Sequence, residues 1–154
     1  MSKKDEIYIS EALKEAKKAF EEDEVPVGAV IVYKNRVIAR GYNQVERLKD
    51  PTAHAEMIAL TSATNFLGTK WLNGSTLYVT IEPCSMCAGA LVLARIQNIC
   101  FGAKDPKTGA CGSVINIVNN NKLNHRIEAK GGILEEECSL LLKEFFKKKR
   151  KRSL

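Results

Sequence analysis

The sequence lacks several features that would assign it to a special class of protein. No run of apolar residues is long enough to span a membrane, and the first residues are charged rather than the apolar core of a signal peptide. There is no internal repeat or linker, and low complexity is confined to a basic segment at residues 147–152. Five cysteines, an odd number without framework spacing, indicate reduced thiols rather than disulfides. We therefore expect one cytoplasmic domain over residues 1–154, with no membrane association.

The charge of the chain is unevenly placed along the sequence. The formal net charge is +6, and residues 147–152 are six consecutive lysines and arginines. Without them, 18 basic residues face 18 acidic ones, so the formal excess lies in this tail. A basic tail is consistent with a solvated helix end, and equally with an arm that binds phosphates on a neutral body.

Apolar periodicity and turn residues predict an α/β layered fold. We expect helices over 5–22, 53–65, 84–94 and from 135 into the tail, and strands over 27–33, 36–42, 76–81, 98–101 and 126–129. Asp50 and Thr52 are candidate caps of the second helix, and residues 43–51 and 102–112 are expected to be loops. This order predicts one sheet that opens with an antiparallel hairpin and continues through helical crossovers as parallel strands.

Five residues in two short motifs carry the chemistry of the chain. His54 is followed by Glu56, and Pro83 precedes Cys84 and Cys87. One imidazole and two thiolates form the three-ligand set of a catalytic zinc site, which keeps a position for water. Alone, a C-x-x-C pair is often a redox pair or half of a structural zinc site, and a single histidine is often structural. Together and in this order they match the signature of zinc nucleobase deaminases, in which the glutamate moves protons. A fourth-ligand role for Glu56 in a closed site stays open.

Nearly the whole chain resembles the bacterial tRNA-specific adenosine deaminases, which convert the wobble adenosine of an anticodon to inosine. The shared segments are Val25–Val30, Asn43, Asp50–Glu56, Thr76–Thr80, Glu82–Ala90 and Phe101–Asp105. The zinc motifs alone fit cytidine, cytosine and guanine deaminases equally well. The segments at 105–110, 124–126 and 145–146 are more discriminating, because they resemble the tRNA enzymes.

The resemblance implies a three-layer α/β/α, cytidine deaminase-like fold with a mixed, about five-stranded sheet. It implies one zinc ion per chain, bound by His54, Cys84 and Cys87, with Glu56 as the proton carrier. It implies a homodimer that hydrolyses a cyclic amidine C–N bond in the anticodon stem-loop of tRNA. The residues that it places at the substrate are Asn43, Ala55, Pro83, Asp105, Lys107, Asn124, His125 and Arg126.

Some alternatives remain open at this stage. Asn43 often bonds its own backbone in loops, and His125 fits a satisfied surface histidine. Another enzyme of the same fold would deaminate free guanine or cytosine, and a non-catalytic RNA-binding module would carry a structural zinc. Release of ammonia from tRNA, from free bases, or from neither separates these three hypotheses.

Overall fold

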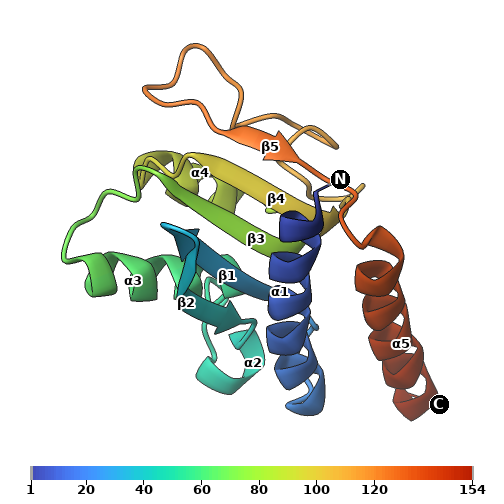
Figure 1. Ribbon diagram of the computed structural model, residues 1–154. Helices are drawn as coiled ribbons and strands as arrows, with labels where there is room; N and C mark the ends of the chain where they lie inside the picture. The colour runs from blue at the N-terminus through green and yellow to red at the C-terminus, as the bar shows by residue number, and fades with distance from the viewer. Residues whose placement is uncertain (1, 154) are drawn as a thin grey trace.

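The computed structural model of the protein describes residues 2–153, which form a sheet between two helical layers (Figure 1). The elements are α1 (Lys3–Glu21), β1 (Gly28–Tyr33), β2 (Arg36–Tyr42), α2 (Val45–Leu48), α3 (Ala55–Leu67), β3 (Ser75–Ile81), α4 (Ser85–Leu93), β4 (Asn98–Ala103), β5 (Glu128–Lys130) and α5 (Glu135–Ser153). Among these residues, no helix has the length and apolar character needed to cross a bilayer.

The strand order of the sheet is β2-β1-β3-β4-β5. β1 is antiparallel to both of its neighbours, β2 and β3, whereas β4 and β5 continue parallel to β3. Because β1 lies between β2 and β3, those two strands run in the same direction. The helices that follow them, α3 and α4, consequently begin at the same end of the sheet.

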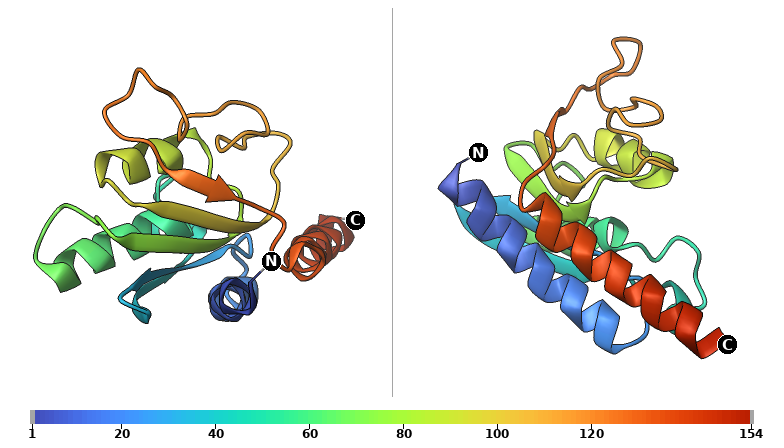
Figure 2. Two further views of the ribbon diagram at one scale, coloured as in Figure 1. Left: turned by 45° about the horizontal axis from the view of Figure 1, so that its top comes forward. Right: turned by 90° about the vertical axis from the view of Figure 1, so that its right-hand side faces the viewer.

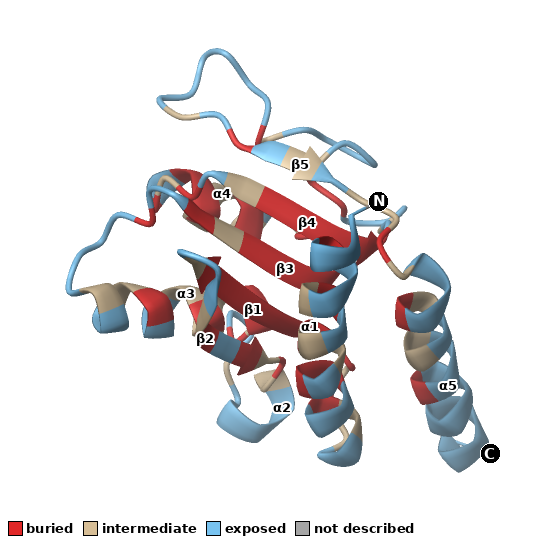
Figure 3. Cartoon of the chain, in the orientation of Figure 1, coloured by how far each residue is buried: buried red, intermediate tan, exposed pale blue. Residues whose placement is uncertain are grey.

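Alternating side chains of the central strands enter two separate hydrophobic cores, one on each face of the sheet. Helices cover both cores, so the molecule has three layers. In β1, Ala29 and Ile31 face one core, while Val30 and Val32 face the other. Every residue of β1 except Tyr33 is buried, as expected for a strand covered on both faces. Figure 3 shows most of β1, β3 and β4 as buried.

The helices are divided between the two faces of the sheet. α3 and α4 contact each other on one face, and α1 and α5 lie side by side on the other (Figure 2). Phe20 of α1 packs edge-on against Phe145 of α5, with 5.9 Å between ring centroids. The predicted α/β/α layering and mixed five-stranded sheet are therefore confirmed.

Two details of the sequence prediction were wrong. α3 begins at Ala55 with His54 as its N-cap, whereas the Asp50 carboxylate accepts the Thr52 N–H and hydroxyl before the helix begins. The segment expected to be a loop at 43–51 contains the short helix α2. Its first N–H groups donate to the buried carboxylate of Glu24, at 2.9 Å from Glu46 and 2.7 Å from Arg47. A cap supplied from more than 20 residues away leaves no local sequence signal.

Candidate active site

The three predicted metal ligands meet where α3 and α4 begin. His54 and Cys84 are the N-cap residues of these helices, and Cys87 lies in the first turn of α4. The backbone carbonyl of His54 accepts the first helical hydrogen bond of α3, from the Ile58 N–H at 3.1 Å. The carbonyl of Cys84 does the same for α4, from the Ala88 N–H at 2.8 Å. Neither side chain caps its own helix, so both remain available as ligands. The prediction that both motifs lie at helix N-termini is confirmed.

The geometry of this group fits a tetrahedral zinc ion. His54 Nδ1 lies 3.7 Å from Cys84 Sγ and 3.6 Å from Cys87 Sγ. A tetrahedral ion with ordinary Zn–N and Zn–S bonds separates nitrogen from sulfur by about 3.6 Å. Within the described residues, these three side chains form the cluster suited to a metal, with all ligand atoms within 4.8 Å of one another. The nitrogen–sulfur set favours zinc over calcium or magnesium, which prefer oxygen.

The pKa values of the three ligand side chains are shifted in different directions. Hydrogen bonds from Cys87 and His54 lower the pKa of Cys84 to about 3. The same contact with Cys84, together with burial, raises the pKa of the Cys87 thiol. The hydrogen bond to Cys84 also raises the pKa of His54. One thiolate is thus already favoured, and a cation would displace the remaining protons.

Glu56 stands beside this group without belonging to it. Its side chain is buried, with 3% of the residue exposed, and burial raises its pKa to about 7. A carboxyl group with a pKa near neutrality both accepts and donates protons readily. Gly41 of β2 allows the close approach of this turn, because a Cβ there would lie 2.5 Å from the Ala55 carbonyl oxygen.

A cavity of about 550 Å³ opens in front of Glu56. Its walls come from the α1–β1 connection, the loop after β2, the two helix N-termini, the loop after β4 and the last turns of α5. The lining residues are Asp23, Glu24, Val25, Val27, Asn43, Val45, Glu46, His54, Ala55, Glu56, Ile81, Glu82, Cys84, Asp105, Thr108, Phe145, Phe146 and Lys149. The size suits a nucleoside, and the two phenylalanines at the rim offer apolar surface.

Several residues predicted at the substrate line this cavity, but their polar groups are engaged. The amide of Asn43 donates to the Val25 carbonyl at 3.2 Å and accepts from the Val45 N–H at 3.3 Å. The Asp105 carboxylate accepts the N–H groups of Lys107 and Thr108 at 3.0 and 3.1 Å. Asn43 therefore bonds backbone groups, which is the alternative raised from the sequence. The carboxylate of Asp105 stabilises the turn that follows it. Pro83 is buried and Lys107 is exposed, and neither lines the cavity.

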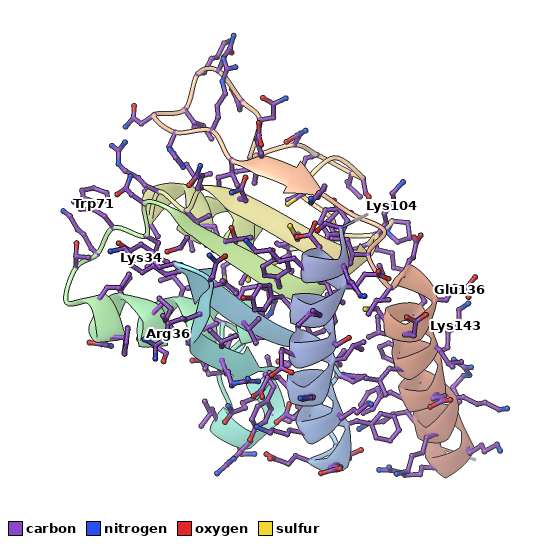
Figure 4. The ribbon with its side chains drawn as sticks, in the orientation of Figure 1. Lys34, Arg36, Trp71, Lys104, Glu136 and Lys143 are labelled. Atoms are coloured by element: carbon purple, nitrogen blue, oxygen red, sulfur yellow. The ribbon has the colours of Figure 1, made fainter. Side chains whose placement is uncertain are left out.

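The segment Asn124–Arg126 lies away from this cavity. His125 Nε2 is 2.6 Å from the carbonyl oxygen of Ile96, just before β4, whereas Asp105 follows the end of β4. The six residues of β4 span about 20 Å, so these predicted contacts lie at the opposite end of the sheet. Arg126 instead lines a larger hollow of about 880 Å³ against β5 and the start of α1. In Figure 4, Lys104 marks the end of the sheet nearer the cavity, and Trp71 marks the far end.

Two buried carboxylates that the sequence did not single out hold the walls of the cavity. Glu24 binds the N-terminus of α2, as described above. Glu82 accepts the Cys111, Ser113 and Asp105 N–H groups at 2.9, 3.1 and 3.2 Å, and also the Ser113 hydroxyl. Burial opposes its ionisation, but these bonds prevail and hold its pKa below the ordinary value. The sequence signal that could have identified Glu82 is its position, since it is an acidic residue directly after the apolar strand β3.

Comparison with known proteins decides the family. The profile of the MafB19-like deaminases matches residues 3–150. The tRNA-specific adenosine deaminase of Bacillus subtilis is 50% identical over 148 residues, which cover 96% of this chain and 92% of that protein. The tRNA-specific adenosine deaminase of Aquifex aeolicus is 54% identical over 145 residues, which cover 94% and 95%. The chain belongs to the tRNA-specific adenosine deaminase family.

A solved structure supports the same assignment for this deaminase. It comes from a study of A-to-I editing by tRNA:A34 deaminases at the wobble position of transfer RNA. The two chains are 43% identical and superpose with a TM-score of 0.84 over 88% of this chain and 98% of the other. The deaminase therefore shares the whole architecture of that protein.

Proposed function

We propose that this single-domain protein is a zinc-dependent hydrolase that converts adenosine to inosine at the wobble position of a tRNA anticodon. The observation that carries the proposal is the placement of a buried carboxyl group, Glu56, beside a three-ligand zinc set at the end of a nucleoside-sized cavity. The names of the relatives support tRNA as the substrate, and a tRNA substrate is consistent with the cytoplasmic location expected from the sequence.

The reaction adds water at C6 of adenine and breaks the C6–N6 bond, which releases ammonia and leaves hypoxanthine. A zinc ion held by His54, Cys84 and Cys87 would make a water molecule nucleophilic at neutral pH. Glu56 would take one proton from the attacking water and give it to ring nitrogen N1, and would then take the proton of the new C6 hydroxyl and give it to the amine, which leaves as ammonia. Its elevated pKa suits both transfers.

The surface charge of the body supports a nucleic-acid substrate. Residues 57–127 carry six lysines and arginines against two acids, Glu82 and Asp105, and Glu82 is buried. Residues 1–56 and 128–146 carry 12 basic residues against 16 acidic ones. The formally neutral body is therefore polarised, with the α3 and α4 side and its loops basic. Two of these cations, Lys70 and Arg95, lie 4.7 and 4.9 Å from the ring centre of Trp71. Such cations attract phosphates from a distance.

One face of α4 supports a homodimer. Met86, Gly89 and Ala90 are half-buried, and Leu93 is 79% exposed. These positions form one stripe of the helix, and a Cβ at Gly89 would meet no atom within 4 Å. Small residues allow close approach of a second helix, and a two-fold axis makes the contact self-complementary. If this axis is perpendicular to α4, the two copies of the helix are antiparallel. The C-terminal end of α4 in one copy, at Leu93, then lies beside the N-terminal end of α4 in the other, where the cavity opens. Asn124–Arg126 of one copy would then approach the cavity of its partner.

Mixed dimers test this arrangement. Gly89→Arg should yield monomers in analytical ultracentrifugation, whereas Leu140→Arg, an exposed apolar residue of α5, should leave the assembly unchanged. Copies with Glu56→Gln mixed with copies with Arg126→Ala should recover activity that neither variant has alone, because one intact pocket forms. Monomeric wild-type protein with full activity contradicts the shared site.

The proposed activity is tested by sequencing a tRNA pool before and after incubation, since inosine is read as guanosine after reverse transcription. We expect an A-to-G change at the wobble position and ammonia in equal amount. Ammonia from free guanine or cytosine, with tRNA unchanged, favours a free-base deaminase. No ammonia from any substrate favours an RNA-binding module with a structural zinc.

A further inference from the structure

We propose that Glu82 is a positioning residue for the substrate, because it fixes the loop at 105–113 as a wall of the cavity. The inference rests on the proposed deaminase function. It adds a role for a residue that neither binds the metal nor carries the proton.

The contacts of Glu82 are directed almost entirely at this loop. One carboxylate oxygen, Oε2, accepts the N–H groups of Cys111 and Ser113, and the other, Oε1, accepts the Asp105 N–H and the Ser113 hydroxyl. The residue is 2% exposed, so water cannot replace these four bonds without rearrangement. The carboxylate thus joins the two ends of the loop at a single point.

The loop in turn closes tightly over the carboxylate. A Cβ at Gly109 would lie 2.5 Å from Glu82 Cδ and 2.5 Å from the Asp105 carbonyl oxygen, so only glycine fits. The Ala110 N–H donates to the Pro83 carbonyl at 2.9 Å, next to the ligand Cys84. The loop that Glu82 holds is therefore also attached to the start of α4.

The consequence for substrate lies in what the loop presents. Asp105 and Thr108 line the cavity, and the Thr108 hydroxyl donates to the Asp105 carboxylate at 2.7 Å. If Glu82 is replaced, this wall moves while His54, Cys87 and Glu56 keep their own supports on α3 and α4. Binding of the substrate should weaken more than the chemical step.

The test compares Glu82→Gln with the wild type on an anticodon stem-loop RNA. An amide cannot accept all four bonds, because its NH2 group would face at least one backbone N–H. We expect KM to rise about tenfold, kcat to stay within about threefold, and zinc content to stay at one per chain. Ser113→Ala should raise KM less, and the double variant should be less than additive, since both changes remove the same bond. Gly109→Ala should resemble Glu82→Gln because it displaces the carboxylate.

Glu15→Gln is the matched control. Glu15 is also a buried glutamate, with 3% exposed, but it pairs with Lys18 and Arg40 on the α1 face. It should leave KM unchanged. Amide hydrogen exchange over residues 105–113 should accelerate in Glu82→Gln and not in Glu15→Gln, and this readout is independent of activity. An inactive wild type with accelerated exchange in Glu82→Gln would refute the proposed function and retain the loop contact. Unchanged KM and exchange, loss of zinc, or a loss confined to kcat would overturn the inference.

Discussion

Glu56 and Glu82 are buried carboxyl groups at the same end of the sheet, yet their surroundings give them opposite properties. Glu82 accepts four hydrogen bonds, which favour its ionised form. Glu56 is dominated by burial, which raises its pKa to about 7. Glu82 is therefore a structural anion, whereas Glu56 can gain and lose a proton near neutral pH.

Replacement of Glu56 by glutamine tests its role directly. The amide keeps the shape of the side chain but cannot cycle a proton, so we expect turnover to fall by about 100- to 10,000-fold. Metal content and RNA affinity should stay unchanged, measured by elemental analysis and by filter binding. Deamination within tenfold of the wild type would assign the proton transfer to another group.

At the level of single residues, the sequence predicted which of the metal-ligand candidates come together better than it predicted the polar contacts around them. His54, Glu56, Cys84 and Cys87 were predictable because metal chemistry restricts both residue type and spacing. The bonds of Asp105 and Glu82 were not, because most of their partners are backbone N–H groups that any sequence supplies. Such contacts depend on loop conformation rather than on residue identity.

Among the elements, those with a local sequence pattern were predictable, and the short helix α2 was not. The helix and strand patterns at α1, β1, β2 and α5 were found within a few residues of their observed bounds. α2 depends on a distant cap and has no local signal, whereas the three-residue strand β5 overlaps the strand expected at 126–129. The direction of β1 relative to β3 is also a tertiary property, since no local pattern specifies it.

Asp5 connects three elements and gives a prediction at this scale. Tyr78 of β3 donates to Asp5 Oδ1 at 2.8 Å, and Lys130 Nζ of β5 lies 2.6 Å from Oδ2. Burial opposes ionisation of Asp5, but hydrogen bonds with Lys130, Tyr78 and Ser2 prevail and lower its pKa from 3.8. The stabilisation is therefore present above pH 3.8 and is lost as the pH falls through the lower folded-state pKa.

Replacement of Asp5 by asparagine should lower the free energy of unfolding by about 1.5–3 kcal/mol at pH 7, the range for hydrogen bonds to charged groups. The difference from the wild type should begin to shrink below about pH 4 and disappear once the pH is below the folded-state pKa of Asp5, because both proteins then lack the anion. Urea unfolding at several pH values measures this. Glu6→Gln, an exposed neighbour in the same turn, is the control and should show no such loss. A difference that is constant with pH would mean that the charge contributes nothing.

For the whole molecule, the basic tail is part of α5 rather than a separate arm. Within the described residues, ion pairs engage two of its six cations, since Lys149 and Arg152 lie 3.4 and 3.0 Å from the Asp23 carboxylate. Lys149 also lines the cavity. Both interpretations of the tail therefore have a structural counterpart. Two cations secure the helix end through ion pairs, and the exposed cations at 147, 148, 150 and 151 form no ion pair within residues 2–153, although Lys148 lies 5.4 Å from the ring centre of Phe20.

Truncation after Phe146 should weaken tRNA binding and reduce its dependence on salt. Every phosphate that the tail no longer neutralises should lower the log–log salt slope by roughly 0.7–0.9, while the preference for adenosine should survive. Glutamine at the four solvent-facing positions should reproduce most of this change, and glutamine at Lys149 and Arg152 should affect the slope less. Binding measured at several salt concentrations separates the two sets. Equal slopes for the truncated and full-length chains would leave the tail as a helix end alone.

The position of β1 between β2 and β3 also determines when the metal group can form during folding. His54 follows β2 and Cys84 follows β3, so the ligands meet only after both strands have paired with β1. Closing these long-range contacts belongs to the late, slow part of folding. Zinc added at the start of refolding should thus leave the refolding rate nearly unchanged in stopped-flow experiments, whereas zinc bound to the folded protein should slow unfolding. We therefore expect zinc to stabilise the finished sheet rather than to nucleate its assembly.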